Sequence, residues 1–375
     1  MKNKKMLIAF PMISVLLTSC GQNYKWADHL DDYVRTMEFH EDFNILQLTD
    51  IHWNANTSSV ASKQYIDKLL DVVETKVGEG KIDLVEITGD QFMLANAYHV
   101  QTFLEFFEQQ AMKRDFQYTV IWGNHDRHGL YNANWLSKQF MKAEHCIYVE
   151  PEDDLYGRSN FVINLTEGNA VKWQIANLDS GASFSESAVS PFRDYDYLRQ
   201  DQVDWWKAEH ELANATVGGA QVPTIAYYHI PQQDNLIAWE SRDDLLKKKF
   251  FKLEGFGDNG NEEYTSSFID EASELNLKAA FMGHAHNVDW TALYKGVVLG
   301  LGVKTGPELY YAHIDPADQT LEVQEGLGSL DDPINEKFDL IGASLVTLKD
   351  GTDFELEHVY FNEREGGDFV RWEKW

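Results

Sequence analysis

The chain has 375 residues and a formal net charge of −29, and 43% of its residues are hydrophobic. This hydrophobic content supplies a large core and excludes an intrinsically disordered chain, while the acidity argues against binding nucleic acid through broad electrostatic attraction. The two cysteines, Cys20 and Cys146, are too few for a readable disulfide framework or a zinc–thiolate site.

The first 20 residues have the layout of an export signal. Three lysines lie among the first five residues, and an apolar run follows over residues 6–17. That run is shorter than the roughly 20 residues that a membrane-spanning helix needs, and it favours a signal peptide. Leu17-Thr18-Ser19-Cys20 resembles the lipobox of bacterial lipoproteins, which implies cleavage before Cys20 and attachment of a lipid to its sulfur.

We therefore divide the chain into a lipoprotein signal peptide, a polar tether and one domain. The predicted boundaries are residues 1–19, 20–41 and 42–375. A lipid on Cys20 would hold the exported protein at a bacterial cell membrane or outer surface without a transmembrane segment. The membrane is thus one predicted partner of this chain.

Three apolar segments in the first half of the chain predict buried strands, and polar residues follow each of them. They cover residues 43–48, 82–87 and 116–122, and helical patterns over residues 58–76 and 97–113 separate them. This βαβαβ alternation predicts a parallel sheet with helical crossovers. Ligands of such sheets bind beyond the carboxyl ends of the strands, so we expect one site fed by several strand ends.

The second half of the chain is less regular and is predicted to be richer in strands. In chain order we expect strands over 161–165 and 171–178, a helix over 197–212, and strands over 222–228 and 278–282. The charged and glycine-rich residues 236–261 are interpreted as a surface excursion, in which the run Lys247-Lys248-Lys249 would be a solvated loop. Residues 297–361 are predicted to be mostly β-structure.

The polar residues at the strand ends are of the kinds that bind metal ions. Metal-activated hydrolysis needs carboxylate oxygens and imidazole nitrogens that converge on one point. Asp50-Ile51-His52 and His284-Ala285-His286 each offer two ligands at positions i and i+2, which project the same way from an extended chain. Asp90 has two oxygens with which to bridge two metals, and Asn124 offers a neutral amide oxygen.

Taken in order, these motifs resemble those of the calcineurin-like metallophosphoesterases. That family carries Asp-x-His, Gly-Asp, Gly-Asn-His-Asp/Glu, His and Gly-His-x-His. The chain has all five, as Asp50-Ile51-His52, Gly89-Asp90, Gly123-Asn124-His125-Asp126, His229 and Gly283-His284-Ala285-His286. The resemblance spans about residues 44–286. It implies an α/β fold of the metallophosphoesterase type, an αββα sandwich of two mixed β-sheets flanked by helices.

The resemblance also implies a role for each residue. Asp50, His52 and His286, with bridging Asp90, would hold one divalent cation; Asn124, His229 and His284, again with Asp90, would hold the other. His125 would be the catalytic histidine, and Asp126 would orient it. The implied cofactors are two divalent ions, Mn, Fe, Zn or Co, with a bridging hydroxide that attacks a phosphate ester. Met93 stands where purple acid phosphatases carry an iron-binding Tyr, which argues against an iron site of that kind.

The sequence leaves the substrate open, and two alternative functions use the same residues. A small-molecule phosphomonoester or phosphodiester is favoured. A nuclease would carry the same motifs, but the acidic charge makes nucleic acid an unlikely partner. A surface lipoprotein that binds a partner without catalysis could use some of the 11 tryptophans as a binding face. Such a relative would be expected to have lost some of the ligands, and this chain has lost none.

Overall fold

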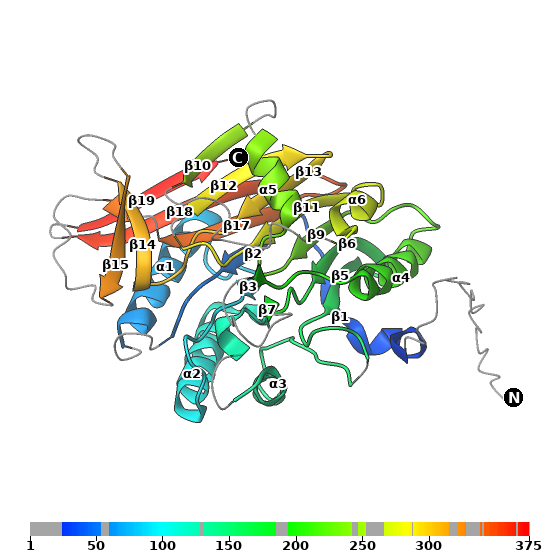
Figure 1. The fold of residues 1–375 in the computed structure, drawn as a ribbon, viewed down its shortest axis with the longest axis horizontal. Helices are drawn as coiled ribbons and strands as arrows, with labels where there is room; N and C mark the ends of the chain where they lie inside the picture. The colour runs from blue at the N-terminus through cyan, green and yellow to red at the C-terminus, as the bar shows by residue number, and fades with distance from the viewer. Residues whose placement is uncertain are drawn as a thin grey trace, which may run out of the picture.

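The computed structural model describes residues 25–53, 60–127, 131–152, 154–184, 194–241, 247–252, 266–286, 288–314, 321–327, 338–339, 341–364 and 367–374. Two large mixed β-sheets form the centre of the molecule, and helices flank them (Figure 1). The αββα sandwich expected from the sequence is therefore confirmed. The expected signal peptide and lipidation site, residues 1–19 and Cys20, lie outside the described residues.

The six-stranded sheet contains the predicted βαβαβ unit. Its order is β19-β18-β17-β2-β3-β4, and β2, β3 and β4 are parallel. The strands are β2 (Phe43–Leu48), β3 (Leu84–Thr88), β4 (Gln117–Ile121), β17 (Gly342–Leu348), β18 (Phe354–Arg364) and β19 (Gly367–Lys374). The crossover helices are α1 (Val60–Val77) and α2 (Ala97–Arg114). The antiparallel strands from the end of the chain extend this sheet beside β2.

The eight-stranded sheet has a parallel centre that is joined to antiparallel neighbours on both sides, and its edge strand β1 pairs in parallel with β5. Its order is β1-β5-β6-β9-β11-β13-β12-β10, and β6, β9, β11 and β13 run parallel. The strands are β1 (Val34–Glu38), β5 (Phe161–Glu167), β6 (Ala170–Asn177), β9 (Thr224–Tyr227), β10 (Lys247–Lys252), β11 (Leu277–Met282), β12 (Val288–Tyr294) and β13 (Val297–Leu301). The parallel centre places the ends of β9 and β11 at one edge.

Short helices and two small sheets complete the described fold. The helices are α3 (Ala133–Phe140), α4 (Gln200–Thr216), α5 (Gln233–Glu240) and α6 (Phe268–Ser273), with 3₁₀ turns η1 (Lys25–Asp28), η2 (Leu30–Tyr33) and η3 (His125–Arg127). The small sheets join β14 (Glu308–Ile314), β15 (Leu321–Leu327) and β16 (Phe338–Asp339), and β7 (Ser183–Phe184) with β8 (Asp194–Tyr195). In the described part of the chain, no helix has the length and hydrophobicity needed to cross a bilayer.

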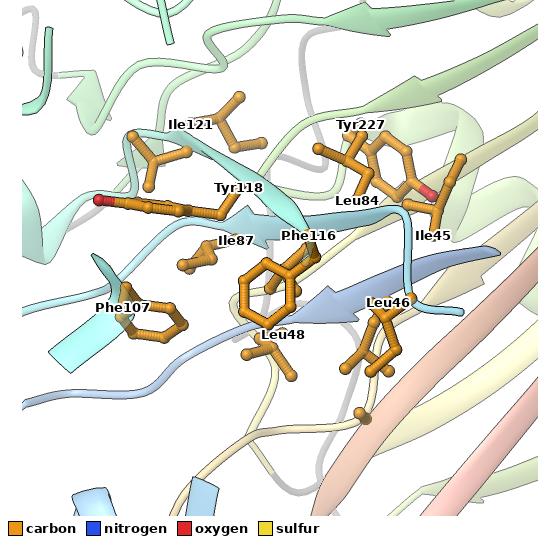
Figure 2. Close-up of a cluster of buried hydrophobic side chains, with 14 of the residues drawn as sticks. Ile45, Leu46, Leu48, Leu84, Ile87, Phe107, Phe116, Tyr118, Ile121 and Tyr227 are labelled. Carbon is orange, nitrogen blue, oxygen red and sulfur yellow. The ribbon is translucent and has the colours of Figure 1, made fainter. Parts of the chain in front are cut away.

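The core explains why the central strands read as continuous apolar runs. Every residue of β2 and β3 is buried, because helices cover one face of their sheet and the second sheet covers the other. Figure 2 shows Ile45 and Leu84 beside Tyr227, which comes from β9 of the other sheet. On the helical side, the rings of Phe107 and Tyr118 lie 5.6 Å apart between centroids. The sandwich therefore fixes both sheets rigidly against each other.

The crossover helices carry local signals that match their observed ends. In α1 the buried residues Tyr65, Ile66, Leu69, Leu70 and Val73 recur at the spacing of one helical face. At the start of α2, the side chain of Asn96 accepts a hydrogen bond from the His99 amide at 2.9 Å. The helices α1 and α2 connect β2 to β3 and β3 to β4 as parallel neighbours, so the ends of these strands lie together.

Two expectations about the surface need correction. Part of the expected tether belongs to the fold, because β1 pairs in parallel with β5 and Trp26 is 1% exposed. The expected loop at Lys247–Lys249 is also wrong, since these residues belong to β10, which pairs with β12. Both strands lie at sheet edges, where charged residues are tolerated and the alternation of polar and apolar residues is weak.

Candidate metal centre

Five strand ends from the two sheets meet at one place. The segments after β2, β3 and β4 come from one sheet, and those after β9 and β11 come from the other. Hydrogen bonds tie the loops together: Asp50 N donates to Gly89 O at 3.1 Å, and His52 N donates to Asp90 O at 3.0 Å. Gly283 N donates to the carbonyl of His229 at 3.1 Å. The prediction of one site fed by several strand ends is confirmed.

A first group of possible ligands joins Asp50, His52, Asp90 and His286. Each is buried, and one donor atom from each lies within 4.8 Å of the others. His52 Nε2 lies 2.9 Å from His286 Nε2, 3.9 Å from Asp50 Oδ1 and 3.8 Å from Asp90 Oδ2. His286 Nε2 is 3.4 Å from Asp50 Oδ1. These are the four residues expected around one cation.

A second group shares one residue with the first. It joins Asp90, His229 and His284 within the same 4.8 Å limit. His229 Nε2 lies 3.3 Å from Asp90 Oδ2 and 3.2 Å from the amide oxygen of Asn124. His229 Nδ1 lies 2.8 Å from the Thr88 carbonyl, to which it can only donate, so Nε2 is the ring nitrogen that faces Asp90. Asp90 therefore stands between two ligand groups.

The backbone is held in unusual conformations to bring these side chains together. Asp50, His52, Asp90 and His284 have φ values of 53°, 50°, 52° and 73°, in the left-handed region that non-glycine residues rarely adopt. Two glycines of the motifs are required for close approach. A Cβ atom on Gly89 would collide with the His229 ring, and one on Gly123 would collide with the Asp90 carboxylate.

The family model of the calcineurin-like phosphoesterases matches residues 43–288, which is more than half of the chain. The chain belongs to this phosphoesterase family. The match begins at the first residue of β2 and ends just beyond His286, so it includes both ligand groups. No curated protein was found to match the chain.

The two carboxylates of the phosphoesterase site each have one oxygen that is held and one that faces the histidines. Asp50 Oδ2 accepts hydrogen bonds from Thr49 Oγ1 at 2.7 Å and from His284 N at 2.8 Å. Asp90 Oδ1 accepts one from His125 N at 2.8 Å. Asp50 Oδ1 and Asp90 Oδ2 are buried and receive no hydrogen bond from the described residues. Buried oxygens of this kind are costly, and the mixed carboxylate, amide and imidazole set fits divalent transition metals.

Neighbouring histidines keep both carboxyls ionised. Burial alone would raise the pKa of Asp50, but His286 and His229 outweigh burial and hold that pKa well below the usual range. Burial would likewise raise the pKa of Asp90, and His229 is again the main group that lowers it. Both side chains are therefore anionic acceptors at neutral pH, as a metal ligand must be.

The histidines divide into two kinds. Burial holds the pKa of His52 well below its ordinary value, lowers that of His286, and lowers that of His284 to about 3. Burial would also lower the pKa of His229, but the adjacent Asp90 carboxylate outweighs it and raises that pKa to about 9. Three imidazoles thus offer neutral lone pairs, whereas a cation beside His229 would displace a proton.

The two residues expected to be catalytic have different surroundings. His125 is half-buried, and its ring centroid lies 5.2 Å from that of His52. Asp126 is fully buried, and its oxygens accept hydrogen bonds from Phe92 N at 3.0 Å and Gly123 N at 2.8 Å. The described contacts of Asp126 thus join the loops after β3 and β4. Its expected role in orienting His125 stays a prediction.

Sequence reasoning missed two residues beside the ligands. Lys304 is 2% exposed, and its ammonium donates a hydrogen bond to the Asp50 carbonyl at 2.7 Å. The ring of Tyr195 lies edge-on to that of His284, with 4.2 Å between centroids. Lys304 follows the apolar strand β13 as the other site residues follow theirs, but a single lysine after a strand is too common to be a signal.

Proposed function

We propose that this phosphoesterase hydrolyses a small-molecule phosphomonoester or phosphodiester with two divalent cations, Mn, Fe, Zn or Co. The observation that carries the proposal is the position of Asp90, which belongs to both buried ligand groups. A carboxylate shared in this way is the arrangement expected for a pair of cations roughly 3.5–4 Å apart. The family supports the reaction class, because its members are named for phosphoester substrates.

Each ligand group would have a defined task. Asp50, His52, Asp90 and His286 would hold one cation; Asp90, Asn124, His229 and His284 would hold the other. When bound, the cations would polarise the phosphate and lower the pKa of water. Because the ligands are buried, their charges act in a medium of low dielectric constant and their orientation needs no reorganisation during reaction.

His125 is proposed as the residue that acts on the leaving group. It is half-buried beside His52 and does not belong to either buried ligand group. Its backbone amide is anchored on Asp90, which fixes it relative to both groups. In this position it would donate a proton to the leaving oxygen or stabilise its negative charge.

The net charge of −29 favours a small substrate over nucleic acid. A nuclease with the same motifs would need a basic surface to attract the phosphate backbone. A relative that binds a partner without catalysis would be expected to have lost some of the ligands, but Asp50 and Asp90 are both present, each with a buried acceptor oxygen that faces a histidine. Hydrolysis of a small phosphate ester is therefore the function that these features favour.

The first experiment measures hydrolysis of p-nitrophenyl phosphate and bis-p-nitrophenyl phosphate by residues 21–375. The protein would be stripped of metal and then given Mn, Fe, Zn or Co separately. We expect turnover only after metal addition, and the ratio of the two rates distinguishes a monoesterase from a diesterase. Equal turnover before and after metal addition would contradict the proposal.

We also propose that the protein is exported and anchored to the membrane by a lipid on Cys20. The sequence around Cys20 supports this, and η1 begins at Lys25, so the linking residues span at most about 18 Å. The anchor would therefore hold the domain close to the membrane surface. In cells, the wild-type chain should label with radioactive palmitate and sediment with membranes, whereas Cys20→Ser should do neither. Labelling of Cys20→Ser would refute this lipidation site.

A further inference from the structure

Lys304 is a buried cation at the edge of the metal centre that none of the family motifs contains. Its side chain is 2% exposed, and its ammonium lies 2.7 Å from the Asp50 carbonyl oxygen. Burial of an ammonium is costly unless hydrogen bonds or opposite charges compensate it. A lysine kept in this place therefore needs a structural or functional reason.

The backbone around Lys304 is fixed from two sides. Thr305 N donates to Thr49 O at 2.7 Å, and Thr49 N donates to Thr305 Oγ1 at 3.2 Å. On the other side, Gly342 N donates to the carbonyl of Lys304 at 2.9 Å. The segment after β13 is thus held between the end of β2 and the start of β17. This places the lysine side chain in a defined position under the Asp50–His52 turn.

The backbone of that turn is strained and depends on its contacts. Asp50 and His52 both have left-handed φ values, which cost free energy and persist only where the surroundings hold them. Their amides are tied to the carbonyls of Gly89 and Asp90. The carbonyl of Asp50 accepts a hydrogen bond from the Lys304 ammonium. The lysine thus fixes the peptide group between Asp50 and Ile51.

We propose that Lys304 is a positioning residue for the first ligand group, where it holds Asp50 and His52 in the geometry that binds a cation. A protonated ammonium has no lone pair, so Lys304 is not itself a ligand. The inference rests on the proposed function, because it assumes that the first group binds metal. The positive charge of Lys304 repels a metal ion bound nearby. The affinity gained by holding Asp50 and His52 in place must therefore exceed the affinity lost to this repulsion.

The test compares Lys304→Met with Lys207→Met by calorimetric titration of the metal-free protein with Mn²⁺. Methionine keeps an unbranched apolar stem, is one bond shorter than lysine and donates no hydrogen bond. We expect the wild type to bind two equivalents, and Lys304→Met to bind one of them about 10- to 100-fold more weakly. Lys207→Met makes the same change on α4, where the ammonium pairs with Glu271 rather than with a ligand, and it should bind both equivalents within about threefold of the wild type.

Three results would overturn the proposal. They are unchanged binding of both equivalents by Lys304→Met, tighter binding by that variant, and an equal loss in Lys207→Met. If Lys304→Met does not fold, Lys304→Gln replaces it. Glutamine is polar but one bond shorter than lysine, so it cannot reach the carbonyl and should weaken the same equivalent.

The titration also separates this inference from the proposed hydrolysis. If the wild type binds two equivalents but hydrolyses neither p-nitrophenyl substrate, the proposed activity fails while the role of Lys304 is still measured. If the wild type is active and Lys304→Met binds Mn²⁺ normally, only the inference about Lys304 fails.

Discussion

Two buried carboxyls four positions apart, Glu86 and Asp90, have opposite surroundings. Asp90 follows β3, at the edge where five strand ends meet, and His229 lies 3.3 Å from its Oδ2. Glu86 lies within β3 and is also fully buried, but neither of its carboxyl oxygens has a hydrogen-bond partner among the described residues. Burial raises the pKa of Glu86 well above its usual range, and the adjacent Asn177 only opposes this shift.

The difference shows that burial alone does not make a carboxyl a metal ligand. In both residues burial favours the neutral form, but only at the strand end do several histidines reverse that preference. The residue after a parallel strand meets loops from both sheets, whereas Glu86 lies inside β3 beside Asn177, which does not outweigh burial. The predictions below test this contrast, beginning with the largest expected effect.

Asp90→Asn should abolish hydrolysis and weaken binding of both cations. The amide is close in size to the carboxylate, but it removes the negative charge that the two ligand groups share. Hydrolysis of p-nitrophenyl phosphate and calorimetric Mn²⁺ titration would measure both effects, and circular dichroism would confirm the fold. Wild-type affinity for two equivalents would show that Asp90 does not bridge the two groups.

His125→Ala should lower kcat by about 10²–10⁴-fold, the usual contribution of a general acid. Binding of both metal equivalents should stay unchanged, because the His125 ring is outside the two ligand groups and its backbone amide still bonds Asp90. The effect should shrink for substrates with good leaving groups, which need less protonation. Loss of a metal equivalent in this variant would instead identify His125 as a ligand.

Glu86→Gln is the matched counterpart of Asp90→Asn, since both replace a buried carboxyl of the β3 region by its amide. Because burial raises the pKa of Glu86 well above its usual range and so favours the neutral form, we expect metal binding and kcat within about twofold of the wild type. Mn²⁺ titration and hydrolysis of p-nitrophenyl phosphate would be measured in parallel for the two variants. An equally large loss of activity in Glu86→Gln would show that the interior of β3 takes part in the site.

The sequence pointed to the residues that the structure brings together in two buried groups because its signals are local. An apolar run followed by Asp, Asn or His can be read from a few adjacent residues, and five such segments gave every proposed ligand. Lys304 could not be found this way, since its partner Asp50 is 254 residues away in the chain. The same holds for β1 at the start of the fold, whose pairing with β5 depends on tertiary contacts rather than on a strong local pattern.

Glu209 on α4 extends the comparison to a carboxyl far from the strand ends. It is 2% exposed, and burial, with a smaller contribution from Asp31, raises its pKa to about 8. The folded protein therefore binds a proton that the unfolded chain releases near pH 4.5. Between these values Glu209 should make stability fall as pH rises, with a slope approaching about 1.4 kcal/mol per pH unit.

Glu209→Gln should remove that part of the pH dependence. Urea unfolding at pH 5, 6.5 and 8 should show the variant gaining stability relative to the wild type as pH increases. Glu211→Gln, an exposed position on the same helix, is the control and should leave the profile unchanged. If the difference between Glu209→Gln and the wild type is constant across this range, Glu209 is ionised in the folded protein. Other groups would then offset the cost of burying a charged carboxylate on α4, as histidines offset it at Asp90.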